Sequence, residues 1–230
     1  MDASRGTART GRSPGRRQEI LAATRALFDE SGSRDAQIED IARAVGINRA
    51  IIYRHFSSKE ELFAEVVVTY LGEVSAAFAA ADRPDASPAL RLEALSDALI
   101  DFGLTHPAFV DCALALVRRP GRQLMDEVGE PTLVRLGEAM VSCLEHGVSA
   151  LEAGNADGTF DVPDPVLLAN LYYTQALGMV SLSALQWSVR SSGSGPAVDV
   201  VVDEKAAAEI KRYARRSVVG QAMREPRFAP

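Results

Sequence analysis

Residues 48–56 combine basic, small and aromatic side chains in an order suited to the major groove of double-stranded DNA. Asn48 is a good N-cap, so the sequence predicts a short helix that begins at Arg49. The guanidinium of Arg49 can form two hydrogen bonds with guanine, while Ala50 and Ile51 can contact thymine methyl groups. Ile51 has an alternative, which is to turn inward. On the outward face we expect Arg49, Ala50, Tyr53, Arg54 and His55.

A preceding helix must hold this segment at a steep angle. Its apolar positions recur every three or four residues, which predicts one buried face: Ile38, Ile41, Ala42 and Val45. Gly46 then supplies the positive φ that ends such a helix. In the second helix Ile52 and Phe56 are four residues apart and form the buried side, with Ile47 packing ahead of the cap. Two helices joined by so tight a turn leave one face of the second helix exposed.

A third helix follows directly. Ser57 or Ser58 caps it, with Glu60 or Glu61 three residues later, which is a capping box in either register. Lys59 lies in the first turn, where backbone NH groups and a cation together suit a DNA phosphate.

The residues AQIEDIARAVGINRAIIYRHFSSKEEL resemble the DNA-binding signature of the TetR family of bacterial one-component regulators. The resemblance is close over residues 18–66 and implies an all-α fold. It implies an N-terminal three-helix helix-turn-helix domain and a C-terminal helical domain for ligand binding and dimerisation. It also assigns Gln37, Tyr53, His55 and Lys59 to DNA phosphates. His55 has the alternative of an ordinary surface histidine, and Tyr53 that of packing between helices with its hydroxyl exposed.

The chain departs from the family pattern at the start of the helix that carries Ile38, Ile41, Ala42 and Val45. Ala36 stands where the family has a Thr or Ser cap, so the capping box that Glu39 would close is broken. We expect Asp35 to take over the cap, which leaves Gln37 to touch phosphate.

Charge is distributed unevenly along the 230 residues. Residues 1–60 hold 11 Lys and Arg against 8 Asp and Glu, whereas residues 61–230 hold 14 against 23. A basic end with an acidic body is typical of a DNA reader joined to a sensor. The predicted domains are a flexible basic arm (1–16), the helix-turn-helix domain (17–63) and the ligand-binding and dimerisation domain (64–230).

The basic arm has no apolar run, so it cannot be a secretory signal and the sequence predicts a cytoplasmic protein. Either the arm is a disordered tail, or its arginines become ordered on DNA by following the backbone or entering the minor groove. The arginines in question are Arg12, Arg16 and Arg17.

The remaining apolar patterns and breakers predict a series of helices and connections. Helices are expected at 17–31, 60–81, 88–105, within 107–128, at 131–153, 166–189 and 204–223. Gly154 is expected to end the helix at 131–153, with a turn at 155–158. Residues 190–199 are expected to form a flexible connection.

Residues 166–189 contain no charge, yet seven polar side chains are spread through them. A lipid-embedded helix would leave those groups without partners, so we expect a helix buried in protein rather than in a membrane. A chain of this size rarely covers one helix completely, which indicates that a second copy supplies part of the cover. The family resemblance implies a homodimer through the last two helices of each subunit.

Catalytic and metal-binding motifs are absent from the sequence. The three histidines do not accompany any nucleophile motif, and no phosphate-binding glycine loop follows a strand, so we predict no enzyme and no cofactor. Cys112 and Cys143 are interpreted as small buried hydrophobic residues, because Cys143 and His146 lack a second pair of zinc ligands. The acidic residues near 155–161 lack the spacing of a calcium loop.

The resemblance implies a small-molecule effector in the second domain. Apolar and aromatic residues with a few polar groups are the candidate lining: Phe102, His106, Phe109, Met140, Cys143, Tyr172, Tyr173 and Met179. Core packing is the alternative for each. We therefore expect a sequence-specific dimeric regulator, a repressor released from an inverted-repeat operator by a largely apolar ligand. The alternative is a ligand-independent or partner-regulated DNA-binding dimer.

Overall fold

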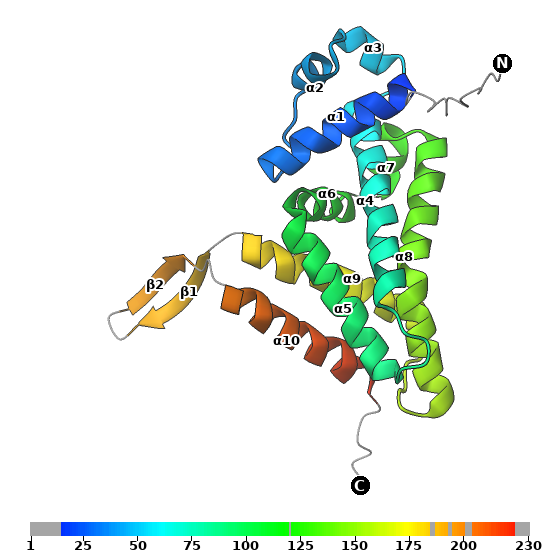
Figure 1. Cartoon of the computed structure of the whole chain (residues 1–230), viewed down its shortest axis with the longest axis vertical. Helices are drawn as coiled ribbons and strands as arrows, with labels where there is room; N and C mark the ends of the chain where they lie inside the picture. Colours follow the sequence, from blue (N-terminus) through cyan, green and yellow to red (C-terminus); the bar gives the residue numbers. More distant parts are fainter. Residues whose placement is uncertain (1–14, 120, 185–186, 193–194, 201–203, 224–230) are drawn as a thin grey trace, which may run out of the picture.

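The first three helices form the upper end of the molecule (Figure 1). The computed structural model describes residues 15–119, 121–184, 187–192, 195–200 and 204–223. The three helices are α1 (Arg16–Ser31), α2 (Ile38–Val45) and α3 (Arg49–Tyr53). Gly32 (φ 67°) and Gly46 (φ 73°) end α1 and α2 in the left-handed conformation, as the sequence predicts for Gly46.

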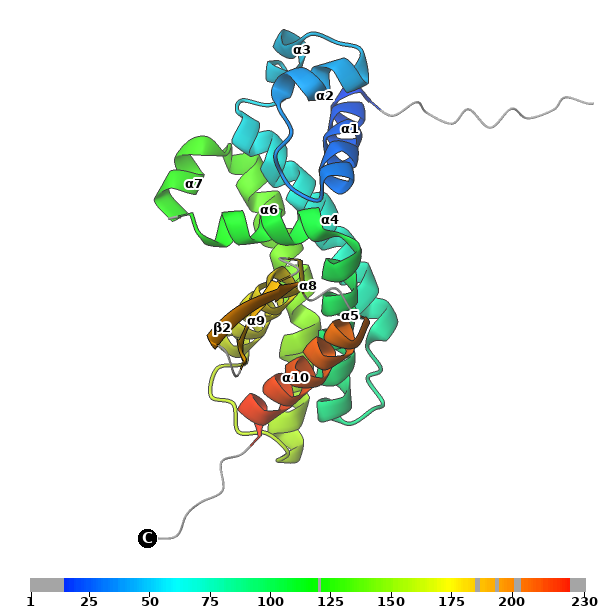
Figure 2. The same cartoon turned by 90° about the vertical axis from the view of Figure 1, so that its left-hand side faces the viewer.

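Helix α4 (Lys59–Ala81) connects this end to the rest of the molecule and packs along α8 (Glu130–Asp157) (Figures 1 and 2). Its buried face carries Leu62, Val66, Val67, Tyr70, Leu71, Val74 and Phe78. In the described part of the chain, α4 is the one unbroken helix long and apolar enough to cross a membrane. Half of its most apolar stretch is buried inside the protein, as expected of a core helix.

The body is completed by helices that pack around α4 and α8. They are α5 (Pro88–Thr105), α6 (Pro107–Val117), α7 (Gly121–Glu127), α9 (Pro165–Ala184) and α10 (Glu204–Ala222). Ser87 caps α5, and Pro88 occupies the first position of this helix, which begins and ends as predicted. Helices α5, α9 and α10 contact one another and lie side by side in Figure 1. The predicted helical fold class is therefore confirmed.

The predicted end of α8 at Gly154 is wrong. The helix continues to Asp157 and ends at Gly158, whose φ is 79°. Gly154 is needed for close packing instead, because a Cβ at this position would lie 2.0 Å from Cδ2 of Phe160. A glycine inside a helix can thus mark a close approach rather than a helix end.

The expected helix over 166–189 and the flexible connection over 190–199 are also wrong in part. Helix α9 ends at Ala184, and β1 (Trp187–Ser192) and β2 (Gly195–Val200) form an antiparallel hairpin between α9 and α10. The register pairs Trp187 with Val200 and Ser192 with Gly195. Val198 and Val200 of β2 pair with Val189 and Trp187 of β1, so these residues form a strand once they have a partner strand.

Candidate nucleic-acid interface and ligand cavity

Helix α3 is fixed by its cap and its buried side. The Asn48 side chain accepts a hydrogen bond of 3.1 Å from the backbone NH of Ile51, which confirms the predicted cap. Ile52 and Phe56 are each 1% exposed, and Ile47 packs against the same core. These contacts leave the opposite side of α3 turned to solvent.

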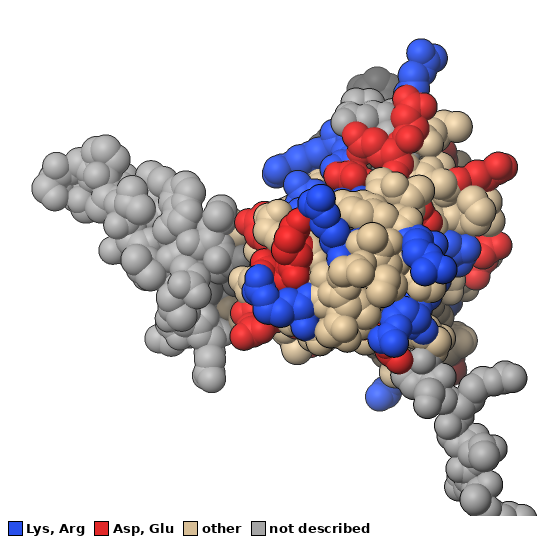
Figure 3. Space-filling model, turned by 90° about the horizontal axis from the view of Figure 1, so that it is seen from above, with Lys and Arg blue, Asp and Glu red and all other residues tan. Residues whose placement is uncertain are grey.

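The exposed side of α3 carries the residues expected to read DNA. Arg49, Ala50 and His55 are exposed, and Tyr53 is 48% exposed, so its ring lies on the surface rather than between helices. Ile51 was expected either to face DNA or to turn inward, and in the structure its side chain is half-buried. Figure 3 shows the molecule from this end, where basic and acidic side chains are interspersed around an uncharged centre.

The ion pair of Arg49 is weak and easily exchanged for a DNA contact. Its guanidinium lies 3.4 Å from the carboxylate of Glu39, and both side chains are more than half exposed. Exposed pairs of this kind contribute at most about 1 kcal/mol. The guanidinium is therefore free to exchange Glu39 for a base or phosphate at little cost.

Gln37, rather than Asp35, occupies the N-cap position of α2. The prediction that Asp35 takes over the cap is wrong, and the Gln37 side chain makes no capping hydrogen bond either. Gln37 is exposed beside the first turn of α2, where its amide can reach a phosphate.

The two basic residues at the start of α1 differ in their surroundings. Arg16 is on the surface and pairs with Glu19 at 2.5 Å. Arg17 turns inward, with its guanidinium 2.8 Å from the carboxylate of Glu65 and 4.7 Å from the ring centre of Phe56. The structure thus gives Arg17 protein partners, and its contact with DNA stays a prediction. Arg12 lies outside the described residues.

The start of α4 is tied to the body of the protein. Ser58 settles the two possible registers, because its hydroxyl accepts a 2.9 Å hydrogen bond from the NH of Glu61. The same hydroxyl donates a 2.6 Å bond to the carbonyl of Glu127 at the end of α7. Lys59 places its ammonium 5.0 Å from the ring centre of Phe63, in the first turn where a phosphate would bind.

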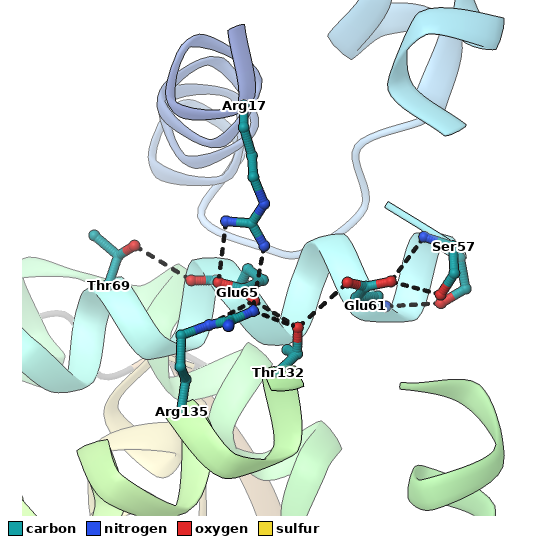
Figure 4. A network of polar contacts seen from close by, with 8 residues as sticks. Arg17, Ser57, Glu61, Glu65, Thr69, Thr132 and Arg135 are labelled. Atoms are coloured by element: carbon teal, nitrogen blue, oxygen red, sulfur yellow. Dashed lines mark hydrogen bonds and ion pairs between the residues drawn. The ribbon is translucent and has the colours of Figure 1, made fainter. Parts of the chain in front are cut away.

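Glu65 joins three helices and was missed in the sequence. Figure 4 shows its carboxylate between Arg17 of α1 and the α8 residues Thr132 and Arg135. The Thr132 hydroxyl donates a 2.5 Å hydrogen bond to it, and Nε of Arg135 lies 3.0 Å away. The available signal is one carboxylate within the apolar run from Leu62 to Leu71.

The Glu65 carboxylate remains ionised although it is 4% exposed. Burial alone would raise its pKa, but hydrogen bonds from Arg135, Thr132 and Arg17 outweigh burial and hold the pKa below its ordinary value. A charge shared by α1, α4 and α8 can couple the position of the DNA-binding helices to that of the body.

A largely apolar cavity lies between α5, α8, α9 and α10, and Phe78 of α4 is also on its wall. Its volume is about 60 Å³. Among the predicted ligand residues, four are on its walls: Cys143, Tyr172, Tyr173 and Met179. Wall residues that the sequence did not single out come mainly from α5 and α10, and include Leu92, Leu95, Ser96, Leu99, Ala214, Ser217 and Val218.

The other predicted ligand residues lie elsewhere in the core. Phe102, His106 and Phe109 surround the ring of Tyr70, with Phe102 and Phe109 ring centres 5.2 Å apart. The Tyr70 hydroxyl donates a 2.6 Å hydrogen bond to Asp29 of α1. Met140 is half-buried against the same core and is not on the cavity wall.

Both cysteines are buried thiols. Burial raises the pKa of Cys112 and of Cys143 to about 12, so both stay protonated at neutral pH. Nδ1 of His146 lies 3.3 Å from Asp82 rather than near Cys143's thiol, which donates to the carbonyl of Leu71. Within the described residues, no group of three His, Cys, Asp or Glu side chains could hold a metal ion.

Known proteins similar to this chain share its N-terminal helices and its fold. The model of bacterial regulatory proteins of the tetR family matches residues 20–66. The HTH-type transcriptional repressor KstR2 of Rhodococcus jostii (strain RHA1) is 30% identical over 146 residues, 64% of this chain and 68% of that protein. The HTH-type transcriptional activator FasR of Mycolicibacterium smegmatis is 31% identical over 87 residues, 38% of this chain and 40% of that protein.

Solved structures extend the similarity over most of the chain. A bacterial regulatory protein of the tetR family from Rhodococcus RHA1 superposes with a TM-score of 0.61 at 19% identity, covering 91% of this chain and 98% of its own. The ketosteroid transcriptional regulator KstR2 of Mycobacterium tuberculosis gives 0.57 at 24% identity, with 94% and 98% covered. These proteins are transcriptional regulators, not enzymes. The chain belongs to the TetR family of bacterial transcriptional regulators.

Proposed function

We propose that this regulator is a homodimeric repressor that binds an inverted-repeat operator in the cytoplasm and is released by a small, largely apolar molecule. Residues 17–63 are assigned to DNA binding, and residues 64–230 to ligand binding and dimerisation. The observation that carries the proposal is the outward face of α3, where Arg49 and Tyr53 are exposed beside a fixed core.

Contacts with DNA are assigned from the exposed residues around α3. Arg49 reads a guanine, and Ala50 with the half-buried Ile51 meets thymine methyl groups. Backbone phosphates are assigned to the exposed or half-exposed residues Arg16, Gln37, Asn48, Tyr53, His55 and Lys59.

The exposed face of α9 supports a dimer. Exposed residues recur along α9 at steps of three or four, so they lie on one face of the helix and form one stripe. The stripe consists of Leu167, Leu171, Thr174, Gly178 and Leu182. The three leucines are 57%, 46% and 57% exposed, respectively. A largely apolar stripe on the surface is typical of a protein interface. Tyr213 of α10, 57% exposed, extends the surface onto the neighbouring helix.

Helix α4 supports ligand-dependent release. Phe78 near its end is on the cavity wall, whereas Ser58 at its start caps the helix next to α3. A molecule that enters the cavity and displaces Phe78 would move α4 and the α3 helix attached to it. A coupling of about 1–3 kcal/mol between the two sites would change DNA affinity severalfold to a hundredfold.

The test starts from DNA selected out of a random pool by the purified protein. We expect an inverted repeat, and we expect Arg49→Ala to weaken binding by about ten- to a hundredfold, the worth of a bidentate base contact. Arg83→Ala is the matched control, because Arg83 is exposed in the loop between α4 and α5. Binding that is equally tight for selected and unrelated DNA would refute the proposal.

The size of the cavity favours a second candidate, a partner-regulated or ligand-independent dimer. A volume of about 60 Å³ holds about four to six water molecules, since each requires about 10–15 Å³. Native mass spectrometry of the purified protein separates the two candidates. A bound or added apolar molecule that occupies the protein without weakening operator binding would favour the second.

A further inference from the structure

The wall of the cavity carries no charged side chain. Its residues are aliphatic, aromatic, sulfur-containing or neutral polar, with Ser96, Tyr172, Tyr173, Gln175 and Ser217 providing the oxygen and nitrogen atoms. An ionised group placed here would lose its hydration without gaining a counter-ion, which is costly. The cavity is therefore suited to a neutral molecule.

Most of the polar groups on this wall already have partners. The Tyr172 hydroxyl donates to the carbonyl of Val218. Ser217 donates a 3.3 Å hydrogen bond to the side-chain oxygen of Gln175, and Gln221 donates to both. These groups shape the wall and are already satisfied when the cavity is empty of ligand.

Ser96 and Tyr173 differ from these groups. Among the buried side-chain nitrogen and oxygen atoms of the described residues, Oγ of Ser96 is the one without a hydrogen-bond partner. The Tyr173 hydroxyl, on a side chain 6% exposed, also makes no hydrogen bond in the described part of the chain, but its oxygen is not among the fully buried atoms. A buried hydroxyl without a partner is costly and uncommon in folded proteins.

The two hydroxyls belong to different helices that line the same cavity. Ser96 is on α5 and Tyr173 on α9, and both residues belong to the wall. Burial raises the pKa of Tyr173 far above neutral pH, so its hydroxyl can donate as well as accept. Each can therefore bond either a hydroxyl or a carbonyl oxygen.

We propose that the effector is a neutral, mainly apolar molecule carrying a hydroxyl or carbonyl group that hydrogen-bonds to Ser96, with Tyr173 as the second partner. This inference rests on the proposed ligand-responsive function and narrows its ligand class. Free carboxylates and ammonium compounds are excluded as tight ligands. A molecule larger than the cavity must displace wall side chains, and half-buried Met179 is the most adaptable of them.

Four eight-carbon probes with different head groups test the ligand class on the full-length protein. Octan-1-ol, octan-2-one, sodium octanoate and octylammonium chloride are titrated at pH 7.5 by calorimetry. We expect saturable binding of the alcohol and the ketone, at least tenfold tighter than that of either ion. Equal or tighter binding of octanoate or octylammonium, or no binding of the alcohol and ketone, would overturn the inference.

A single substitution tests the anchoring group. Ser96→Ala is expected to weaken octan-1-ol binding about tenfold, the value of one hydrogen bond, while thermal stability without ligand is unchanged or higher. Ser142→Ala on the exposed side of α8 is the matched control and is expected to bind like the unaltered protein. Unchanged octan-1-ol affinity in Ser96→Ala would contradict the assignment. The comparison of head groups needs no variant and stands if Ser96→Ala does not fold.

Operator binding in the presence of the probes distinguishes this inference from the proposed function. If octan-1-ol binds through Ser96 and the protein stays on its operator, the release mechanism fails and the ligand class stands. If octanoate releases the operator as effectively as octan-1-ol, the ligand class fails and the release mechanism stands.

Discussion

The exposed faces of α3 and α9 differ in the partner for which each is suited. The α3 face presents Arg49, Tyr53 and His55, which are basic or amphipathic and remain hydrated. The α9 face presents Leu167 and Leu171, whose apolar surface is costly to leave in water. The first is suited to reversible, salt-dependent binding of DNA, and the second to lasting association with another copy of the chain.

These two regions are connected by buried contacts rather than by a flexible linker. Helix α4 passes from α3 to the cavity, and the Glu65 carboxylate joins it to α1 and α8. Each exposed face is therefore specialised, while the connection between them is an unbroken helix held by buried contacts. Each of the following substitutions alters one side of this comparison or the connection itself.

The largest expected effect comes from placing a charge in the α9 stripe. Leu171→Glu should convert the dimer into a monomer and lower operator affinity at least a hundredfold, because two linked half-sites gain about 10²–10⁴ in avidity. Light scattering after gel filtration measures the change from twice 24.6 kDa to 24.6 kDa. Val134→Glu, at a side chain 53% exposed on α8, is the matched control and should remain dimeric. A dimeric Leu171→Glu protein would place the interface elsewhere.

The second effect concerns packing where α8 ends. Gly154→Ala should lower the free energy of unfolding by about 3 kcal/mol, because its Cβ would overlap the ring of Phe160. Gly137→Ala on the same helix has open space around the new methyl group and should raise stability by about 0.5–1 kcal/mol. Urea denaturation of the two variants measures the contrast. Equal stabilities would mean that α8 and the Phe160 segment can separate without cost.

The third effect concerns the connection between the two regions. Glu65→Gln should lower the free energy of unfolding at pH 7 by about 2 kcal/mol, since Arg17 and Arg135 lose a buried counter-ion but are themselves partly exposed. Glu73→Gln on the same helix breaks an exposed pair with Arg25 and should cost about 0–1 kcal/mol.

The pH dependence of that effect follows from the lowered pKa of Glu65. A carboxylate with a lowered folded pKa contributes stability above its ordinary value of about 4.5, and that stability is lost as the pH falls below it. The difference between the unaltered protein and Glu65→Gln should therefore be largest at neutral pH and shrink below pH 4.5. A difference that grows on acidification would show that the carboxylate is not the stabilising form.

The smallest expected effect is on the α3 cap. Asn48→Ala removes the side-chain acceptor for the Ile51 NH and should cost about 1 kcal/mol of stability. Asn48→Asp retains an acceptor and should cost less. Thermal denaturation of both variants measures the difference. If Ala and Asp are equivalent, packing of Ile52 and Phe56 alone holds α3 in place.

The recognition helices could be predicted from the sequence because their signals are local. Asn48, Gly46 and the buried pair of Ile52 and Phe56 act within a few residues of each other, and the structure has each in its predicted role. The prediction that Asp35 caps α2 was wrong. The N-cap residue is Gln37, and its side chain makes no capping hydrogen bond, so this helix begins without a side-chain cap.

The cavity and the α1–α4–α8 connection depend on contacts between distant residues. Glu65 meets Arg135, seventy positions later, and Ser96 faces a wall built from α9 and α10, so neither role has a local pattern. Phe102 and Phe109 look like ligand residues by type, yet they pack around Tyr70 in the core. Residue type alone therefore does not separate a cavity wall from a packed core.

Binding to DNA with altered half-site spacing tests the central claim most directly, namely that two copies of α3 are presented side by side to one duplex. Five base pairs inserted between the selected half-sites rotate them by about half a helical turn, while ten restore the face. Gel-shift titration should show that five inserted base pairs weaken binding at least a hundredfold. Ten inserted base pairs should largely restore binding, since the subunits then need only follow a longer spacing on the same face of the duplex. The claim would be contradicted if a single half-site bound as tightly as the full repeat and if the spacing had no effect on affinity.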